Sequence, residues 1–188
     1  MQEDTDLRVM HVMGGGDVGG AKTQIMNMVT GLAERNEVML LSFRDGPFAD
    51  EARERGIDVR VIERHNPFRA AHTMRDLVDE FKPDIIHCHG GRANLMGAMV
   101  RRSREVPILT TVHSDYRLDY LGSPLKQHTL GTANAIALRF LDFYQPVADR
   151  MARTLIERGF DPERIVKIYN GMDFDRPEGE FDRVAYLR

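Results

Sequence analysis

The residues of this chain best suited to chemistry begin with a glycine-rich stretch at positions 14–23, GGGDVGGAKT. It follows an apolar run and precedes a segment with helical spacing. Glycine lets a backbone approach a ligand closely, and the start of a helix favours an anion because its first N–H groups have no partner within the helix. The stretch therefore predicts an anion-binding loop. A tight turn without a ligand is the alternative.

Two known nucleotide-binding patterns fit this stretch only in part. The glycine spacing matches the G-x-G-x-x-G of dinucleotide loops, but that pattern also needs an acidic residue at the end of the second strand, where Ser42 stands. A Walker loop needs its lysine directly after the last glycine, and Ala21 separates that glycine from Lys22. Walker hydrolases also need an aspartate for magnesium, where His113 stands. Both nucleotide readings remain as alternatives.

Three histidines lie at or near the ends of predicted strands. His87 and His89 are two residues apart, so their side chains share one face of a strand while Cys88 points to the other. A His-x-His pair can supply half of a zinc site, but the sequence offers no third ligand at a suitable spacing. His113 ends the following strand and precedes the polar residues SDYR, which suit a polyhydroxylated ligand. His113 and His89 are the better candidates for a functional role.

The composition is that of a soluble globular domain, with 188 residues of which 42% are hydrophobic and 29% charged. A net charge of −3 provides no general attraction to nucleic acid. The single cysteine excludes an internal disulfide, no apolar run approaches the ~20 residues of a membrane span, and the start does not resemble a signal peptide. We therefore expect a cytoplasmic protein.

A basic cluster, Arg101, Arg102 and Arg104, falls near the end of a predicted helix. Cations there complement the helix dipole, so a solvated helix end is expected. Peripheral contact with the anionic inner face of a membrane is the alternative.

Seven short apolar runs alternate with helical segments, and these elements must position the residues described above. The predicted strands cover residues 7–13, 37–43, 58–62, 84–89, 107–113, 142–147 and 164–171. This alternation predicts an α/β fold, with right-handed crossovers and a Rossmann-like, doubly wound parallel sheet of about seven strands. Ligands of such sheets bind at the carboxyl ends of the strands, where the glycine loop and the histidines lie.

In these motifs and their order the chain resembles the N-terminal domain of a family 4 (group 1) retaining glycosyltransferase, one half of a GT-B fold. The resemblance rests on GDVGGA, KPDIIHCHG, PILTTVHS and GFDPERIVKIYNGMDFD, and it runs from residue 7 to about residue 174. The last segment is the most specific, since members of the family have a sequence similar to V-I-x-N-G-V-D there.

The resemblance implies an enzyme that transfers a sugar, expected to be a hexose, from a nucleotide diphosphate sugar to an acceptor with retention. It implies no metal and no further cofactor. Residues 1–174 are expected to form the acceptor side of a cleft between two domains, and residues 175–188 the start of a linker. The family's E-x7-E motif is absent from the chain. We therefore expect a fragment that lacks the donor-binding domain and is inactive alone.

The resemblance also assigns residues to roles. It places His113 beside the transferring sugar as the catalytic residue. It places the first loop near the donor diphosphate and the acceptor, through Gly16, Asp17, Gly19, Gly20 and Lys22, although the family often has an acidic residue where Lys22 stands. On the acceptor side it places His89, Arg92, Asp115 and Tyr116, and at the interdomain contact Asn170 and Gly171.

Two alternatives belong to other functional classes. One is a nucleotide-binding oxidoreductase or NTPase-like domain built on the glycine loop, and the other is a carbohydrate-binding module without catalysis. The sequence leaves open the sugar, the nucleotide base and the acceptor, which can be a saccharide, a lipid or a small molecule.

Overall fold

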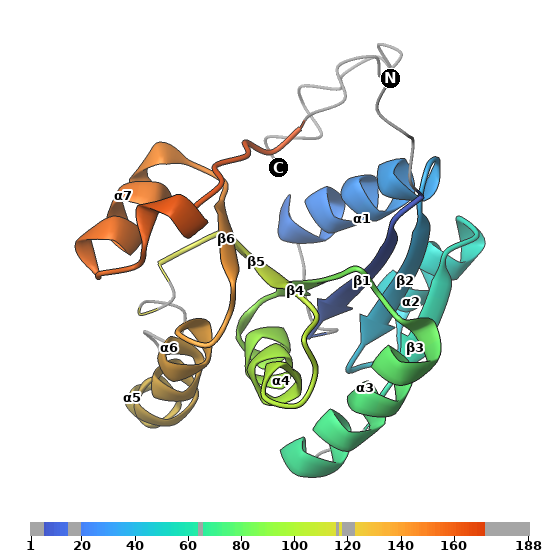
Figure 1. Ribbon diagram of the computed structural model, residues 1–188, viewed down its shortest axis with the longest axis horizontal. Coiled ribbons are helices and arrows are strands. Elements are labelled where there is room, and N and C mark those ends of the chain that lie inside the picture. The colour runs from blue at the N-terminus through green and yellow to red at the C-terminus, as the bar shows by residue number, and fades with distance from the viewer. Residues whose placement is uncertain (1–5, 15–19, 64–65, 116, 118–122, 172–188) are drawn as a thin grey trace, which may run out of the picture.

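A parallel sheet of six strands forms the centre of the protein, in the order β3-β2-β1-β4-β5-β6 (Figure 1). The computed structural model describes residues 6–14, 20–63, 66–115, 117 and 123–171. The strands are β1 (Arg8–Met13), β2 (Glu37–Ser42), β3 (Asp58–Val61), β4 (Ile85–His89), β5 (Ile108–Val112) and β6 (Phe143–Pro146). All five neighbouring pairs are parallel, so the predicted doubly wound parallel sheet is confirmed.

Helices connect the strands and cover both faces of the sheet (Figure 1). They are α1 (Gly20–Ala33), α2 (Pro47–Glu54), α3 (Pro67–Phe81), α4 (Gly91–Arg101), α5 (Pro124–Lys126), α6 (Thr132–Leu138) and α7 (Asp149–Glu157). A π-helical turn, Gln127–Gly131, joins α5 to α6, and a short 3₁₀ helix, Pro162–Arg164, follows α7. No helix within the described ranges has the length and apolar character needed to cross a membrane.

The expectation of a seventh strand at residues 164–171 is wrong, and a proline explains why. Val166 donates its N–H to the carbonyl of Tyr144 at 2.9 Å, and Ile168 donates to that of Pro146 at 3.2 Å, so this segment runs along β6. A parallel ladder would also need an N–H from Pro146, and proline has none. The segment therefore makes only an isolated bridge to the edge of a six-stranded sheet.

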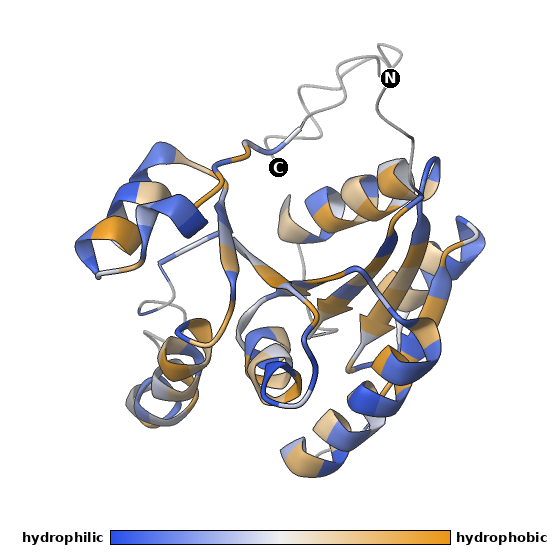
Figure 2. Ribbon diagram, in the orientation of Figure 1, coloured by the Kyte–Doolittle hydropathy of each residue, from blue (hydrophilic) through white to orange (hydrophobic). Residues whose placement is uncertain are grey.

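Alternate residues of β1 face the two sides of the sheet. Met10 and Val12 are fully buried in a cluster with α3 and α4, whereas Val9 and Met13 join a second cluster with α1 and α2. Hydrophobic colour accordingly marks the strands in Figure 2, while α3 alternates between hydrophobic and hydrophilic positions. His11 lies between Val9 and Met13, so its imidazole faces the α1 side of the core.

Local signals set two of the helix starts. The Asn66 side chain accepts hydrogen bonds from the N–H groups of Phe68 and Arg69, as expected of an N-cap before Pro67. Helix α7 begins at Asp149, an acidic residue in its first turn, and Ala148 holds the N-cap position. The Asp149 carboxylate contacts Lys167 and Tyr169, so it fastens the segment after α7.

Helix α4 packs closely on the sheet because position 97 has no side chain. A Cβ atom at Gly97 would lie 2.8 Å from the Sγ atom of Cys88 in β4 and 3.3 Å from a methyl carbon of Ile108 in β5. Real Cβ atoms essentially never approach another atom to 2.8 Å. Glycine at this position therefore sets how near α4 lies to β4 and β5.

We predict that Gly97→Ala destabilises the protein by about 1–3 kcal/mol, the usual cost of overpacking a core. The matched control is Gly31→Ala in α1, where nothing lies within 4 Å of the new Cβ atom. This control should stabilise by roughly 0.5–1 kcal/mol, because alanine loses less backbone entropy than glycine in a helix. Urea unfolding of both variants measures the sign and size of each change in the free energy of unfolding. Equal effects would show that the approach of α4 does not depend on Gly97.

Candidate active site

A cavity of about 210 Å³ opens where the carboxyl ends of β4 and β5 meet the start of α1. Its lining includes His89, Gly90 and Gly91 after β4, and His113 and Ser114 after β5. We call it the strand-end cavity. The order of the strands reverses between β1 and β4, and this is the place where open α/β sheets bind ligands.

Two of the predicted site residues share this cavity. His113 is the first residue after β5 and is half-buried, while His89 ends β4 and is buried. Ala21 and Ile25 from the first turns of α1 line the same cavity. The structure therefore brings His89 and His113 next to the helix that follows the glycine loop.

A buried polar network behind the cavity fixes its walls. Thr110 donates its hydroxyl to the Oδ1 atom of Asn94 at 2.6 Å, and the Nδ2 group of Asn94 donates to Oδ1 of Asn134 at 3.0 Å. These residues join β5, α4 and α6. The Asn134 side chain lies 3.2 Å from where a Cβ atom of Gly91 would be, so a larger residue at the start of α4 would push this side chain by a few tenths of an ångström. Its members are scattered along the chain, so no local sequence pattern indicates this network.

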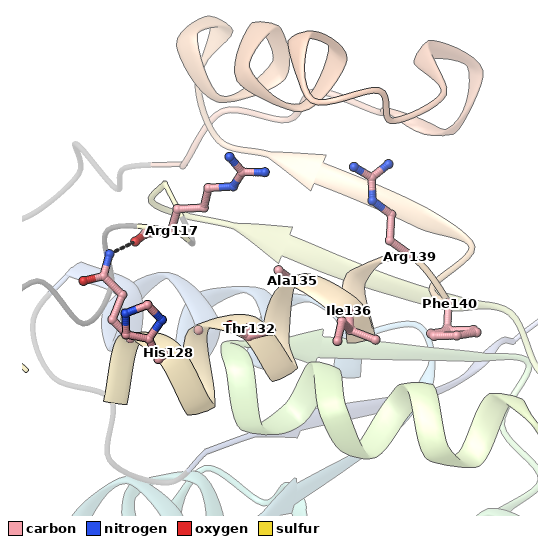
Figure 3. Close-up of a pocket in the computed structure, with 9 residues that line it drawn as sticks. Arg117, His128, Thr132, Ala135, Ile136, Arg139 and Phe140 are labelled. Atoms are coloured by element: carbon pink, nitrogen blue, oxygen red, sulfur yellow. Dashed lines mark hydrogen bonds between the residues drawn. The ribbon is translucent and has the colours of Figure 1, made fainter. Parts of the chain in front are cut away.

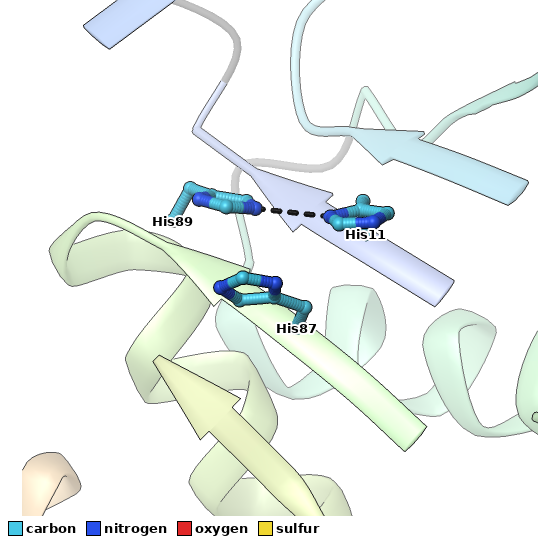
Figure 4. A group of neighbouring side chains, drawn as sticks. All are labelled: His11, His87 and His89. Carbon is cyan, nitrogen blue, oxygen red and sulfur yellow. Dashed lines mark hydrogen bonds between the residues drawn. The ribbon is translucent and has the colours of Figure 1, made fainter. Parts of the chain in front are cut away.

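A second buried cluster lies beside the cavity and is formed by three imidazoles (Figure 4). His11 comes from β1, and His87 and His89 come from β4. Nδ1 of His11 lies 3.1 Å from Nε2 of His89. Burial lowers the pKa of His11 to about 4 and holds the pKa values of His87 and His89 well below the ordinary value, so all three rings are neutral at neutral pH.

The predicted cationic site residues lie away from the strand-end cavity. Lys22 forms an ion pair of 2.9 Å with Glu51, so the ammonium group of Lys22 is held at α2. The guanidinium of Arg92 lies 4.7 Å from the ring centre of Phe43 and donates to that residue's carbonyl at 3.4 Å. Neither residue is among those that line the cavity.

Asp115 is held in a salt bridge. Its two carboxylate oxygens accept hydrogen bonds from the guanidinium of Arg158 at 2.5 and 2.6 Å, and one also accepts from the N–H of Arg117 at 3.0 Å. Both charged side chains are less than one-fifth exposed. The pKa of Asp115 is lowered, chiefly by the hydrogen bond from Arg158. The pair fastens the loop after β5 to the end of α7.

The other assigned residues lie elsewhere. Asn170 and Gly171 are exposed, and Gly171 lines a second cavity of about 540 Å³ between the outer side of α1 and the segment after β6. Gly20 is the first residue of α1. The assignments that fall outside the described residues are those of Gly16, Asp17, Gly19 and Tyr116.

A larger groove, about 810 Å³, runs along α6 away from the strand ends (Figure 3). Arg117 and Arg139 extend from it in the same direction, while Ile136 and Phe140 supply apolar surface. Arg139 donates to the carbonyls of Arg158 and Gly159, and its guanidinium lies over the ring of Phe160. This cation therefore caps the end of α7.

Two members of the basic cluster also have acidic partners. Arg101 binds Asp142 at 2.9 Å, and Arg104 contacts Asp79. These pairs favour the solvated helix end over a membrane-binding patch.

Comparisons with known proteins agree with this arrangement of strands. The family model described as Glycosyltransferase Family 4 matches residues 18–176. Anabaena Alr3699/HepE in complex with UDP-glucose superimposes with a TM-score of 0.71 at 19% identity, over 89% of this chain and 44% of that one. The lipopolysaccharide outer core galactosyltransferase WaaB gives 0.69 at 15% identity, over 94% and 50%.

A third solved structure with the same fold belongs to an enzyme of a different kind. UDP-GlcNAc 2-epimerase from Neisseria meningitidis, bound to UDP-GlcNAc, gives a TM-score of 0.64 at 11% identity, over 86% of this chain and 45% of that one. At these identities the likeness shows the fold alone. The chain spans about half the length of these proteins. A comparison with curated proteins finds no match.

We predict that Asp115→Asn lowers the free energy of unfolding by roughly 1.5–3 kcal/mol at neutral pH, the range for hydrogen bonds to charged groups. Arg158 lowers the pKa of the folded carboxyl, so the stabilisation is present above the unfolded pKa of ~3.9 and is lost as the pH falls through the folded pKa. Denaturant unfolding between pH 7 and pH 3 should show the curves of variant and wild type converging in acid.

The control for this experiment is Asp58→Asn, which removes an exposed ion pair of 2.9 Å with Arg60. Exposed pairs contribute about 0–1 kcal/mol, so this variant should change stability little. A loss at Asp115 no larger than the loss at Asp58 would contradict an anchoring role for the pair with Arg158.

Proposed function

Because the chain belongs to Glycosyltransferase Family 4, we propose that it forms the acceptor-side half of an enzyme that transfers a hexose from a nucleoside diphosphate sugar with retention. The observation that carries this proposal is the strand-end cavity at the switch point of the sheet, which His113 shares with the start of α1. Residues 1–174 supply this half. The rest of the cleft belongs to a second, donor-binding half.

The start of α1 suits the negative charge of a sugar diphosphate. The first N–H groups of a helix have no partner within it and carry a partial positive charge, so they attract phosphate groups. The first turn of α1 contains no acidic residue that would oppose this. Alr3699/HepE has been captured with UDP and with UDP-glucose, which makes UDP-sugars the first donors to examine for this chain.

His113 is suited to position the sugar. Its imidazole can hydrogen-bond a sugar hydroxyl from the floor of the cleft, next to the place where the diphosphate meets α1. Transfer requires the anomeric carbon to face the acceptor, and a small misplacement of reacting groups can cost ~100-fold in rate. We assign His113 this positioning role at the reacting sugar. His89 then forms part of the cavity wall beneath the sugar.

The direct test is an assay on the full-length protein that carries this chain. Purified protein is mixed with a panel of UDP- and GDP-sugars and with saccharide, lipid and small-molecule acceptors. Release of nucleoside diphosphate with formation of a product of retained anomeric configuration, followed by NMR, supports the proposal. Conversion of UDP-GlcNAc to its 2-epimer without an acceptor would favour the epimerase activity found on the same fold.

We predict that His113→Ala lowers turnover by roughly 100-fold, with little change in melting temperature. A half-buried side chain facing a cavity leaves no core void when it is removed. The control is His72→Ala in α3, whose side chain is 75% exposed, and it should change neither quantity. A His113 variant that melts much earlier and keeps its turnover would make this residue structural.

A further inference from the structure

The three buried imidazoles form a compact cluster that the proposed sugar transfer does not require. His11 and His87 are register partners in the parallel pairing of β1 with β4, and Met13 is the partner of His89. The three residues are 0%, 4% and 2% exposed, and their side chains share one face of the sheet. Each ring is adjacent to the other two, with ring centres 4.3 to 5.4 Å apart.

The spacing of the ring nitrogens fits one metal ion. One nitrogen from each imidazole can be chosen so that all three lie within 4.8 Å of one another. Two nitrogens bound to a tetrahedral zinc ion at ~2.0–2.1 Å lie roughly 3.3 Å apart. The 3.1 Å between Nδ1 of His11 and Nε2 of His89 is close to this value.

A hydroxyl group fixes the orientation of one ring. Nε2 of His87 lies 2.7 Å from the hydroxyl of Thr111 in β5. Where this nitrogen carries the hydrogen and donates it, Nδ1 is left with the lone pair and can act as the ligand atom. Metal-binding histidines usually have such an outer partner, which sets both tautomer and ring angle.

Hydrogen bonding within the cluster is incomplete. Among the described residues, Nε2 of His11 and Nδ1 of His89 have no hydrogen-bond partner, although both atoms are buried. Buried polar atoms are nearly always paired, so these two nitrogens, which lie on the far side of each ring from the 3.1 Å contact, are unusual for a protein core.

The site also has a route of entry. His89 lines the strand-end cavity, which connects the cluster to the mouth of the cleft. Three imidazoles leave one position of a tetrahedral ion for water, and the cavity offers room for it on the side of His89.

We propose that His11, His87 and His89 bind one divalent transition-metal ion of the Zn²⁺ type at the junction of β1 and β4. The ion links the two strands on either side of the switch point and stabilises the folded chain. This site is separate from the sugar-transfer proposal, because neither the donor nor the acceptor needs to contact the ion.

The test uses the purified chain after treatment with a chelator. Addition of Co²⁺ should give one equivalent of bound metal, with an absorption spectrum typical of four-coordinate nitrogen ligation, and Zn²⁺ should displace it. The melting temperature should rise with the Zn²⁺ concentration, because a ligand that binds only the folded state stabilises it by mass action. Absence of a bound equivalent overturns the proposal and makes the cluster a neutral core network.

Variants decide which residues hold the ion. His11→Gln and His89→Gln should weaken binding by more than the ~10–100-fold that loss of an outer partner costs, and Thr111→Val should cost about that range. The matched controls are His72→Ala and His128→Ala, two exposed histidines that should leave binding unchanged. Equal weakening in the controls, or unchanged binding in His11→Gln, overturns the assignment.

Thr111→Val keeps the shape of the core and removes no ligand, so it decides the question if a glutamine variant fails to fold. Unchanged affinity in this variant contradicts the site. The assay of sugar transfer tests the proposed function separately from the metal site. Failure of metal binding would leave the prediction for His113 unchanged.

Discussion

The parallel pairing of β1 with β4 is the interaction on which the rest of this structure depends. These strands are neighbours in the sheet, although 71 residues, 14–84, separate the end of β1 from the start of β4. The connections that leave their carboxyl ends run to opposite faces, α1 to one side and α4 to the other (Figure 1), and the strand-end cavity lies beside the start of α1. The cavity and the imidazole cluster both lie at this junction because the topology leaves it open there.

Hydrogen bonds and ion pairs from distant elements hold the rim of this opening. The Asn94 network joins α4, α6 and β5, and the pair between Asp115 and Arg158 joins the loop after β5 to α7. Arg139 donates to the carbonyls of Arg158 and Gly159 at the same end of α7. Buried polar groups are costly unless paired, so such connections favour one arrangement of the loops over others. The residues that meet a ligand are thus supported by residues whose polar groups are already satisfied.

The sequence contained enough to predict the architecture, because buried parallel strands and the helices between them leave distinct local patterns. Asn66 before Pro67 and the position of His113 after β5 follow from local rules of the same kind. The third histidine, His11, could not be found this way. Its partnership with His87 requires knowing that β1 and β4 are neighbours, which alternation alone does not reveal. The missing seventh strand likewise depends on a single N–H absent at Pro146.

The sequence also does not show which partners the charged side chains have. These partners matter for the proposed binding of an anion. Lys22 and Arg92, which the family resemblance placed near the ligand, are engaged by Glu51 and Phe43. The described lining of the strand-end cavity contains no lysine or arginine, so the proposed attraction for phosphate rests on the backbone N–H groups at the start of α1. One helix end contributes typically 0.3–1 kcal/mol of charge stabilisation at an exposed site, far less than the roughly 8 kcal/mol of a micromolar complex. Under the proposed function, most of the affinity for a sugar diphosphate would therefore come from the second, donor-binding half, and this half would orient the sugar and the acceptor rather than hold the donor.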